Sequence, residues 1–238
     1  MRTAVLADIH GNLEALEAVT RHAGSHNPDR YVCLGDSVGY GADPNECMAW
    51  ALQDSEFSLM GNHEKAVIEP SLREWFNPDA REAVIWTESV LHERYKKAIS
   101  ALPYLRIQDG LVFAHGTPDE PEHFNYLMTY HDAVRSFRAF EEKICFIGHT
   151  HVPSFFTYPT RKAGHFPAGV LKLNAAERYL LNPGSVGQPR DGDRRASYGI
   201  YDDRNLTFEI FRVEYDNAKA ARKIRKAGLP RFLADRLL

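Results

Sequence analysis

No apolar run in the sequence approaches the roughly 20 residues that a membrane-spanning helix needs. A secretory signal peptide is not expected either, because a β-prone run begins by Thr3 and a charged residue follows at Asp8. The formal net charge is only −3 over 238 residues, which gives no general signal for binding nucleic acid or anionic membranes. We therefore expect neither a membrane nor a nucleic acid as the main partner.

Cysteine is also scarce, with three residues at uneven spacing and no Cys-x-x-Cys pair that would suggest structural zinc. Cys33 and Cys145 lie within apolar, strand-like runs, and Cys47 lies in an expected helix. Free buried thiols in a reducing compartment are the simplest interpretation. We therefore expect a cytoplasmic protein, and the hydrophobic content of 44% is that of a globular domain.

What the sequence does contain is a repeated pattern in which an apolar, β-prone run is followed by Asp, Asn or His. Packing favours apolar side chains at such positions, and a buried Asp or His needs a partner. Taken singly, these residues have simpler explanations, such as a helix N-cap or a hydrogen-bonded core histidine. Together, seven oxygen and nitrogen donors at strand ends predict a metal site. The seven donors are Asp8, His10, Asp36, Asn62, His115, His149 and His151.

The first quarter of the sequence alternates strand-like and helix-like segments. Strands are expected at residues 3–7, 31–34 and 57–60, and helices are expected from Asn12 and after Pro44. This alternation predicts parallel strands joined by right-handed crossovers, with ligands at the carboxyl ends of the strands. Extended geometry there would point residues i and i+2 in the same direction.

From Pro103 onward the sequence is mostly β, beginning with a tight hairpin turn at Asp109-Gly110. Helices are expected at about residues 131–142 and from near Asp216. Later strands are expected at residues 154–158, 169–173, 179–181, 197–201 and 207–213. We therefore predict one α/β domain over residues 1–238, in which two β-sheets pack face to face with helices outside.

A helical insertion is expected at about residues 70–102, because Asn77 and Pro78 form a helix start and apolar residues follow at helical spacing. It would pack on the sheet, or it would form a cap or a dimer surface. The final helix carries a basic face, which would be solvated over an apolar stripe of Ala218, Ala221 and Ile224, or would bind nucleic acid. The six histidines outside the donor pattern are expected on the surface or in loops.

The donor set predicts the chemistry of the site. Asp36 is the natural bridge, because one carboxylate can hold two cations about 3.5–4 Å apart. Nitrogen and oxygen donors without thiolate suit Mn²⁺, Fe, Zn²⁺, Co²⁺ or Ni²⁺ better than Ca²⁺. The net charge of the site would be about +1, from two divalent cations, the carboxylates of Asp8 and Asp36, and a bridging hydroxide. Such a site favours an anionic, hydrolysable group, and phosphate esters fit this description.

His63 follows a candidate ligand but is not needed as one. Because Asn62 points to the metal, His63 would project into the space for substrate. A protonated imidazole there would stabilise the phosphoryl transition state or protonate the leaving oxygen. The alternative is a histidine that orients a ligand.

In their order along the chain, five motifs resemble those of the calcineurin-like metallophosphoesterase superfamily. They are Asp8-Ile9-His10, Gly35-Asp36, Gly61-Asn62-His63-Glu64, His115-Gly116 and Gly148-His149-Thr150-His151. The resemblance implies a four-layer α/β/β/α sandwich and a hydrolase with two divalent metal ions, for which Mn²⁺ is the expected metal. It also implies one metal site of Asp8, His10, Asp36 and His151, and a second of Asp36, Asn62, His115 and His149. His63 would be the catalytic residue that binds no metal.

Further segments resemble the small bacterial and archaeal phosphodiesterase branch. They are Asp43-Pro44-Asn45, Phe76-Asn77-Pro78, and Asn182-Pro183-Gly184-Ser185-Val186 followed by Pro189-Arg190. The guanidinium of Arg190 would contact a substrate phosphate, or Arg190 is a surface turn residue. Phosphoprotein phosphatases of the superfamily carry Asp-Arg soon after the Gly-Asp motif, where this chain has Ser37-Val38. Without that arginine, a monoanionic diester is favoured over a dianionic monoester.

These observations predict a two-metal phosphoesterase that hydrolyses diesters or monoesters of small molecules, with nucleotides as the expected substrates. The alternatives are a phosphoprotein or diadenosine tetraphosphate hydrolase, and a non-catalytic scaffold of the same fold. We expect substrate specificity in the loops at residues 117–130 and 160–168, which are polar and irregular.

Overall fold

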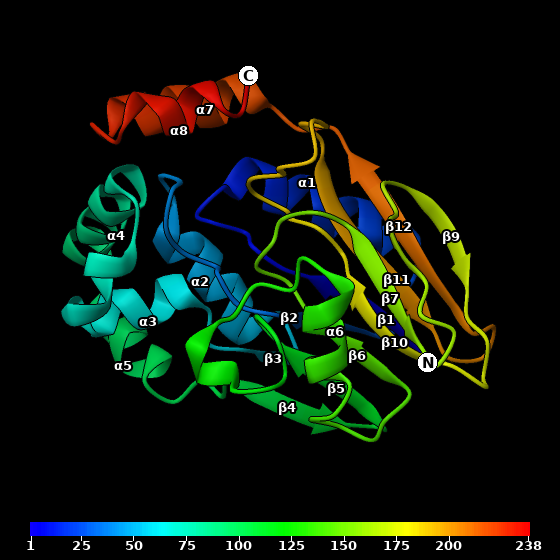
Figure 1. Cartoon of the computed structure of the whole chain (residues 1–238). Helices are drawn as coiled ribbons and strands as arrows, with labels where there is room; N and C mark the ends of the chain where they lie inside the picture. Colours follow the sequence, from blue (N-terminus) through cyan, green and yellow to red (C-terminus); the bar gives the residue numbers. More distant parts are fainter.

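The structure is a computed structural model that describes residues 1–238, and its strands form two mixed six-stranded sheets (Figure 1). The first sheet has the order β3-β2-β1-β11-β12-β9, and the second has the order β4-β5-β6-β10-β7-β8. The strands are β1 (Arg2–Leu6), β2 (Arg30–Cys33), β3 (Phe57–Ser58), β4 (Leu105–Gln108), β5 (Leu111–Ala114), β6 (Ile144–Phe146), β7 (Ser154–Tyr158), β8 (Ala163–His165), β9 (Gly169–Lys172), β10 (Arg178–Asn182), β11 (Ala196–Asp202) and β12 (Thr207–Val213).

The helices differ from the expected ones in three places, one of which is the final helix, which is divided into Asn217–Lys226 and Arg231–Asp235. The helix expected at about 131–142 ends at Ser136, and the insertion is divided because Leu91 has extended backbone geometry. The helices are α1 (Leu13–Ser25), α2 (Pro44–Gln53), α3 (Asn62–Ile68), η1 (Pro70–Trp75), α4 (Pro78–Val90), α5 (Glu93–Ile99), η2 (Pro121–His123), α6 (Tyr130–Ser136), α7 (Asn217–Lys226) and α8 (Arg231–Asp235), where η marks a 3-10 helix. No helix is long and apolar enough to cross a bilayer.

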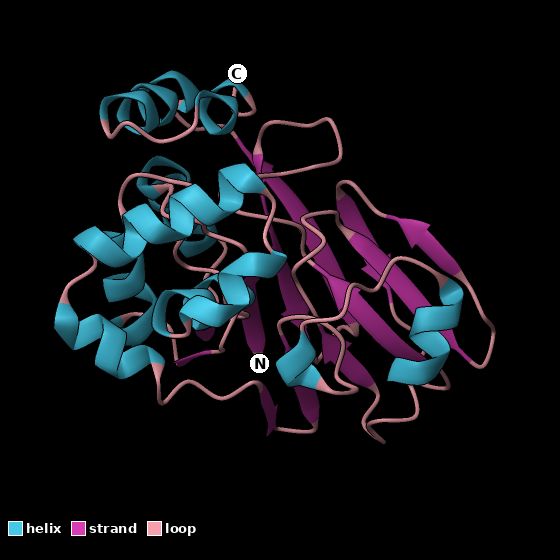
Figure 2. Ribbon diagram, turned by 60° about the vertical axis from the view of Figure 1, so that its left-hand side comes forward, coloured by secondary structure: helices cyan, strands magenta, loops and turns pink.

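Alternation along the strands explains the layers (Figure 2). In β1, Val5 faces the second sheet and joins a core of residues from both sheets, including Phe113 and Phe146. Its neighbours Ala4 and Leu6 face the other way, into a core shared with α1 and α2. The outer face of the second sheet is covered by α6 and the turn after it. The predicted four-layer α/β/β/α arrangement is confirmed.

The strands that run parallel are those that precede residues of the candidate site. In the first sheet β1, β2 and β3 run parallel, whereas β1 pairs antiparallel with β11. In the second sheet β5, β6 and β10 run parallel. The hairpin of β4 and β5 turns at Asp109 and Gly110, which both have positive φ as the predicted tight turn requires. All three cysteines are free and buried, as expected.

The C-terminal helices α7 and α8, at the top of the molecule in Figure 1, pack beside α4 of the insertion. Ala220, Ala221 and Ile224 of α7 are buried in a cluster with Ala80 and Ala83 of α4. Ala218, which was predicted in the apolar stripe, is exposed instead, because the buried positions recur at 220, 221 and 224. The basic face is partly paired rather than only solvated: the Lys223 ammonium lies 2.7 Å from a carboxylate oxygen of Glu14 and 2.6 Å from one of Asp43.

We expect Lys223→Met to lower the free energy of unfolding by about 1 kcal/mol, because the buried Glu14 carboxylate loses a partner while Lys219 still contacts it. Burial alone would raise the pKa of Glu14, but hydrogen bonds from Lys223 and Lys219 lower it below the usual 4.5. Ionised Glu14 therefore stabilises the fold above about pH 4.5, and this contribution is lost as the pH falls.

Urea unfolding at several pH values measures this effect. The difference in stability between wild type and Lys223→Met should be largest at pH 7 and should shrink below about pH 4.5. Lys226→Met, on the exposed face of the same helix, is the matched control and should leave stability nearly unchanged. Equal losses for both variants at every pH would contradict the proposed role of the ion pair.

Candidate functional site

Six of the seven predicted donors lie in irregular segments that follow the strands, and Asn62 is the first residue of α3. β1 ends at Leu6 and β6 at Phe146, two or more residues before the donors. The donors with positive φ are Asp8 (55°), His10 (51°), Asp36 (54°), His149 (67°) and His151 (61°). Extended geometry therefore does not align them, which corrects the sequence expectation. Left-handed backbone at a non-glycine residue costs about 1 kcal/mol or more, and such strain gathers at functional sites.

The structure brings all seven predicted donors together from both sheets. The Nε2 atoms of His10 and His151 lie 3.0 Å apart, and His151 Nε2 lies 3.4 Å from Asp8 Oδ1. On the other side, His115 Nε2 lies 3.2 Å from both Asn62 Oδ1 and His149 Nδ1.

Asp36 lies between these two groups. Its Oδ2 atom is 3.6 Å from His10 Nε2 and 3.3 Å from His115 Nε2. Its Oδ1 atom accepts the backbone N–H of His63 at 2.9 Å. Only one oxygen of Asp36, Oδ2, therefore faces both groups.

The hydrogen bonds of the imidazoles show which ring nitrogens carry protons and which can bind a metal. The Nδ1 atoms of His10, His115 and His151 lie 3.1, 2.9 and 2.6 Å from the backbone carbonyl oxygens of Val38, Leu34 and Gln188. A carbonyl oxygen only accepts, so each Nδ1 carries the proton and each Nε2 presents a lone pair. Lone pairs 3.0 Å apart, beside two carboxylates, repel one another unless cations lie among them. This donor set fits two divalent cations.

Burial and charge set the ionisation of the donors. Burial lowers the pKa of His10, His149 and His151 well below the ordinary value. Burial opposes the charged form of His115 too, but the Asp36 carboxylate raises its pKa to about 9. Burial also opposes ionisation of Asp36, whereas His115 and His63 hold its pKa well below the usual range. Burial raises the pKa of Asp8 to about 7. Three imidazoles are thus neutral donors, and a cation bound at Nε2 of His115 would take the place of the proton that His115 carries beside Asp36.

His63 lies at the start of α3, with its ring packed against Tyr40 and Phe76 at centroid distances of 4.5 and 5.0 Å. Its Nδ1 atom is buried without a hydrogen-bond partner and faces the backbone of Gly39, where a Cβ would lie 2.1 Å away. Burial lowers the pKa of His63 to about 4, which favours the neutral imidazole until an anion lies beside the ring. One ring nitrogen of His63 also lies within 4.8 Å of the donor atoms of His10 and Asp36.

Glu64 has a role in the site that the sequence argument missed. Its buried carboxylate accepts backbone N–H groups of Asp36 (2.8 Å), Ser37 (2.6 Å), Val38 (3.2 Å) and Gly61 (3.2 Å). It therefore holds the strained turn that presents Asp36. The available signal was a Glu three residues after Gly61, which is the position of a capping box at a helix start.

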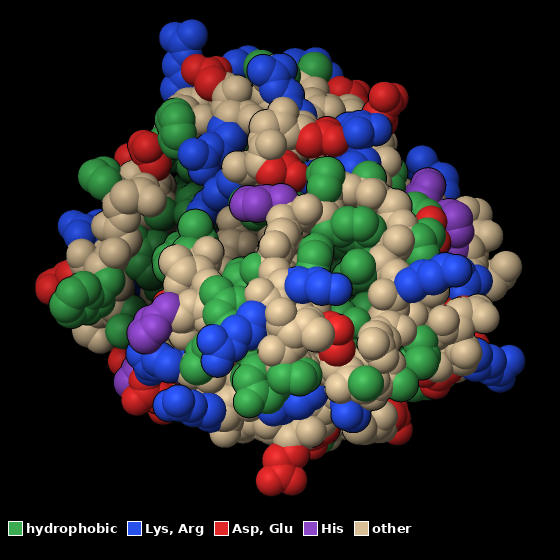
Figure 3. Space-filling view, turned by 45° about the vertical axis from the view of Figure 1, so that its right-hand side comes forward, with side chains coloured by type: hydrophobic (Ala, Val, Ile, Leu, Met, Phe, Trp, Pro, Cys, Tyr) green, Lys and Arg blue, Asp and Glu red, His purple; other side chains and the backbone are tan.

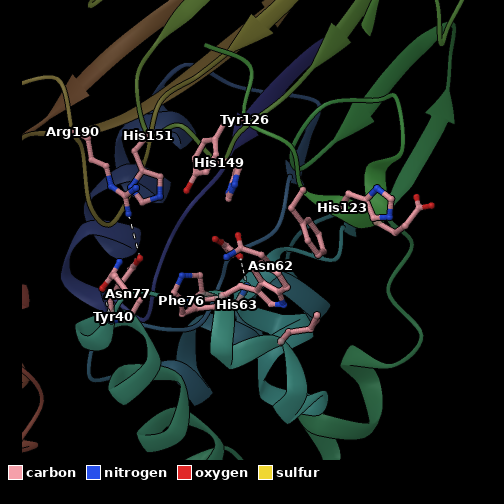
Figure 4. Close-up of a pocket in the computed structure, with 16 residues that line it drawn as sticks. Tyr40, Asn62, His63, Phe76, Asn77, His123, Tyr126, His149, His151 and Arg190 are labelled. Atoms are coloured by element: carbon pink, nitrogen blue, oxygen red, sulfur yellow. Dashed lines mark hydrogen bonds between the residues drawn. The ribbon is translucent and has the colours of Figure 1, made fainter. Parts of the chain in front are cut away.

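A cavity of about 440 Å³ opens over the donors, between the insertion and the loop after β5 (Figures 3 and 4). Its lining residues are Asp36, Tyr40, Asn62, His63, Leu72, Trp75, Phe76, Asn77, Ala80, Glu122, His123, Phe124, Tyr126, His149, His151 and Arg190. The loop at 117–130 borders the cavity as expected, but residues 160–168 do not, because β8 lies at the far edge of the second sheet. The insertion forms a wall of the cavity, which agrees with the cap alternative, and Val84, Leu91 and Ile99 join the core on the outer face of the first sheet, which agrees with packing on the sheet.

Arg190 is a cavity residue and not a surface turn residue. Its side chain is half-buried, and Nη2 donates to Gln188 Oε1 at 3.0 Å and to the Tyr40 hydroxyl at 3.3 Å. Figure 4 shows Arg190 beside His151 at the edge of the donor group. Of the histidines outside the donor pattern, His123 reaches the rim of the cavity, and His22, His26, His92, His131 and His165 lie on the surface or half-buried.

Known proteins resemble this chain over nearly its whole length. An uncharacterized protein of Methanocaldococcus jannaschii is 39% identical over 240 residues, which cover 98% of this chain and 96% of the relative. The crystal structure of a metallophosphoesterase from Sphaerobacter thermophilus is 39% identical, with a TM-score of 0.90 and coverage of 100% of this chain and 98% of that one. A hypothetical protein of Pyrococcus horikoshii shares the fold, with a TM-score of 0.81, 18% identity and coverage of 99% and 97%.

The sequence model of the calcineurin-like phosphoesterase superfamily domain matches residues 1–205, which include every predicted donor, His63 and Arg190. The match ends within the hairpin of β11 and β12, so α7 and α8 lie outside it. Because the matched region is most of the chain and the fold agrees over its whole length, the motif resemblance is confirmed. The chain therefore belongs to the calcineurin-like phosphoesterase superfamily.

Proposed function

We propose that this protein is a two-metal phosphoesterase that hydrolyses small-molecule phosphodiesters. The observation that carries the proposal is the convergence of imidazole lone pairs and two buried carboxylates around Asp36 Oδ2. One cation would be held by Asp8, His10, Asp36 and His151, and the other by Asp36, Asn62, His115 and His149. When bound, the cations would supply Lewis acidity toward the phosphoryl oxygens and an activated water.

The protein's own residues orient this chemistry. Glu64 and the carbonyl oxygens of Val38, Leu34 and Gln188 hold the donors in place, so that little reorganisation is needed when substrate binds. Arg190 would donate to a substrate phosphoryl oxygen, because its guanidinium lines the cavity beside the donors.

His63 is the proposed general acid. It lines the cavity, and because its Nδ1 atom is buried against Gly39, Nε2 is the ring nitrogen left for the substrate. In an imidazolium, both ring nitrogens donate, and a negatively charged phosphoryl group beside the ring would favour that form. The imidazolium would then protonate the leaving oxygen.

The cavity walls favour a substrate with a flat aromatic part. Tyr40, Trp75, Phe76, Phe124 and Tyr126 line the space above the donors. Trp75 is 88% exposed, so its ring has a free face. Stacking of a base on an aromatic ring contributes about 1–3 kcal/mol. Together with the missing arginine after Asp36, these walls support a nucleotide diester as the substrate class.

Turnover of bis-p-nitrophenyl phosphate tests the proposed activity. Chelated protein should be inactive, and addition of Mn²⁺ should restore hydrolysis, with slower hydrolysis of p-nitrophenyl phosphate. The Mn²⁺ titration should saturate at two ions per chain by metal analysis. Absence of turnover with Mn²⁺, Fe²⁺, Zn²⁺, Co²⁺ and Ni²⁺ would favour a non-catalytic scaffold, and faster hydrolysis of a phosphopeptide would favour a phosphoprotein phosphatase.

Asp36→Asn should lose bound metal as well as activity, because the charged Oδ2 atom is the only one that faces both donor groups. We expect metal affinity to fall by at least about 100-fold, because loss of a residue that only supports a ligand already lowers affinity by up to that factor. Asp54→Asn, at an exposed position after α2, is the matched control. Full metal content in Asp36→Asn would contradict the bridging role.

His63→Ala should keep its metal content and lose activity by about 100-fold or more, the usual contribution of a general acid. The loss should be smaller for a p-nitrophenyl ester than for an alkyl ester, because p-nitrophenolate leaves without a proton. His131→Ala, at an exposed position on α6, is the control. If metal analysis found the His63→Ala protein depleted, His63 would be a ligand and not the acid.

A further inference from the structure

Two arginines beside the donor group share one neutral acceptor. Gln188 Oε1 accepts from Arg190 Nη2 at 3.0 Å and from Arg236 Nη1 at 3.3 Å. Neither guanidinium has a carboxylate within 4.0 Å. Four other basic residues of the C-terminal helices do form salt bridges with carboxylates. They are Lys219, Lys223, Arg225 and Arg231. Arg222 and Lys226 of α7 also lack a carboxylate within 4.0 Å, but both are exposed, so Arg236 is the unpaired residue of this segment that shares an acceptor with Arg190.

Arg236 is held in this place by packing. It follows α8, whose residues Leu233 and Ala234 are buried with Tyr40 of the site and Ala80 of the cavity wall. The Arg236 guanidinium lies 4.8 Å from the centre of the Phe232 ring. Burial and the charge of Arg190 lower the pKa of Arg236, as expected for two cations close together. Packing thus fixes the backbone at Arg236, and its exposed side chain extends from there to Gln188.

The pair is also joined to the donor group through the backbone. The backbone N–H of Arg190 donates to the carbonyl oxygen of His151 at 3.2 Å, and His151 Nδ1 donates to the carbonyl oxygen of Gln188. Figure 3 shows Lys and Arg atoms along the upper margin of the hollow, beneath the C-terminal helices. An anion held by both guanidiniums would therefore be part of the same ligand that enters the cavity.

We propose that Arg190 and Arg236 form a subsite for a second anionic group of the substrate, a terminal phosphate monoester on a phosphodiester. Two guanidiniums that repel each other across one amide oxygen gain from an anion between them, and paired guanidiniums match phosphate oxygens well. Arg236 is then a specificity-determining residue supplied by a segment beyond the matched family domain. This inference rests on the proposed phosphodiesterase function.

A matched pair of dinucleotides tests the subsite. The dinucleotides ApA and pApA share the same diester and differ only in the 5′-phosphate. We expect wild-type kcat/KM to be about tenfold higher for pApA, through a lower KM, since one charge-assisted contact is worth about that factor. Arg236→Gln should bring the ratio of the two kcat/KM values close to one, and Arg236→Lys should recover part of it.

Arg231→Gln is the control, because Arg231 is 86% exposed and pairs only with Asp235 on the same helix. It should keep the wild-type ratio. A wild-type ratio near one, or an unchanged ratio in Arg236→Gln, overturns the subsite while leaving the phosphodiesterase activity in place. If neither dinucleotide is hydrolysed, the proposed function fails instead. Equilibrium dialysis then tests the subsite: tighter binding of pApA that Arg236→Gln abolishes supports it, and equal binding of both overturns it.

Discussion

The structure depends on one electrostatic constraint, which is that two buried carboxylates and several imidazole nitrogens meet at the base of an open cavity. Asp8 and Asp36 are 0% and 1% exposed, and three imidazoles donate their Nδ1 protons to backbone carbonyls and away from the centre. Buried charge without compensation costs several kcal/mol. Divalent cations would neutralise these carboxylates, and their binding would therefore stabilise the folded protein.

The backbone around this centre is correspondingly strained and braced. Asp36 stands in a left-handed turn, and the carboxylate of Glu64 accepts three consecutive N–H groups of that turn. Asp8 accepts the backbone N–H of His149 from the other sheet. The two sheets are therefore joined at their carboxyl edges by hydrogen bonds as well as by the apolar core between them. Precise ligand geometry in such a centre comes from these supports as much as from the ligands.

The cavity walls come from other segments than the candidate metal ligands. The walls of the cavity come from η1, the start of α4 and the loop after β5, and α7 and α8 cover its edge. The salt bridges of Lys223 and the apolar faces of α7 and α8 fix this cover to α1, α4 and the loop before α2. A common catalytic centre can thus serve different substrates when the covering segments change, as is general for sites placed on a shared fold.

Local patterns in the sequence determined the strands, the two sheets and the identity of the donors. Val5 and Leu6 face opposite layers because alternation is a local property, and Asp8 or His115 is conspicuous because polar residues rarely follow buried strands. Only the tertiary structure decided the rest. The bridging oxygen of Asp36, the support from Glu64, the walls from the insertion in place of residues 160–168, and the approach of Arg236 to Arg190 all join residues far apart in the chain. Such contacts follow from how crossovers and layers pack, which no local pattern encodes.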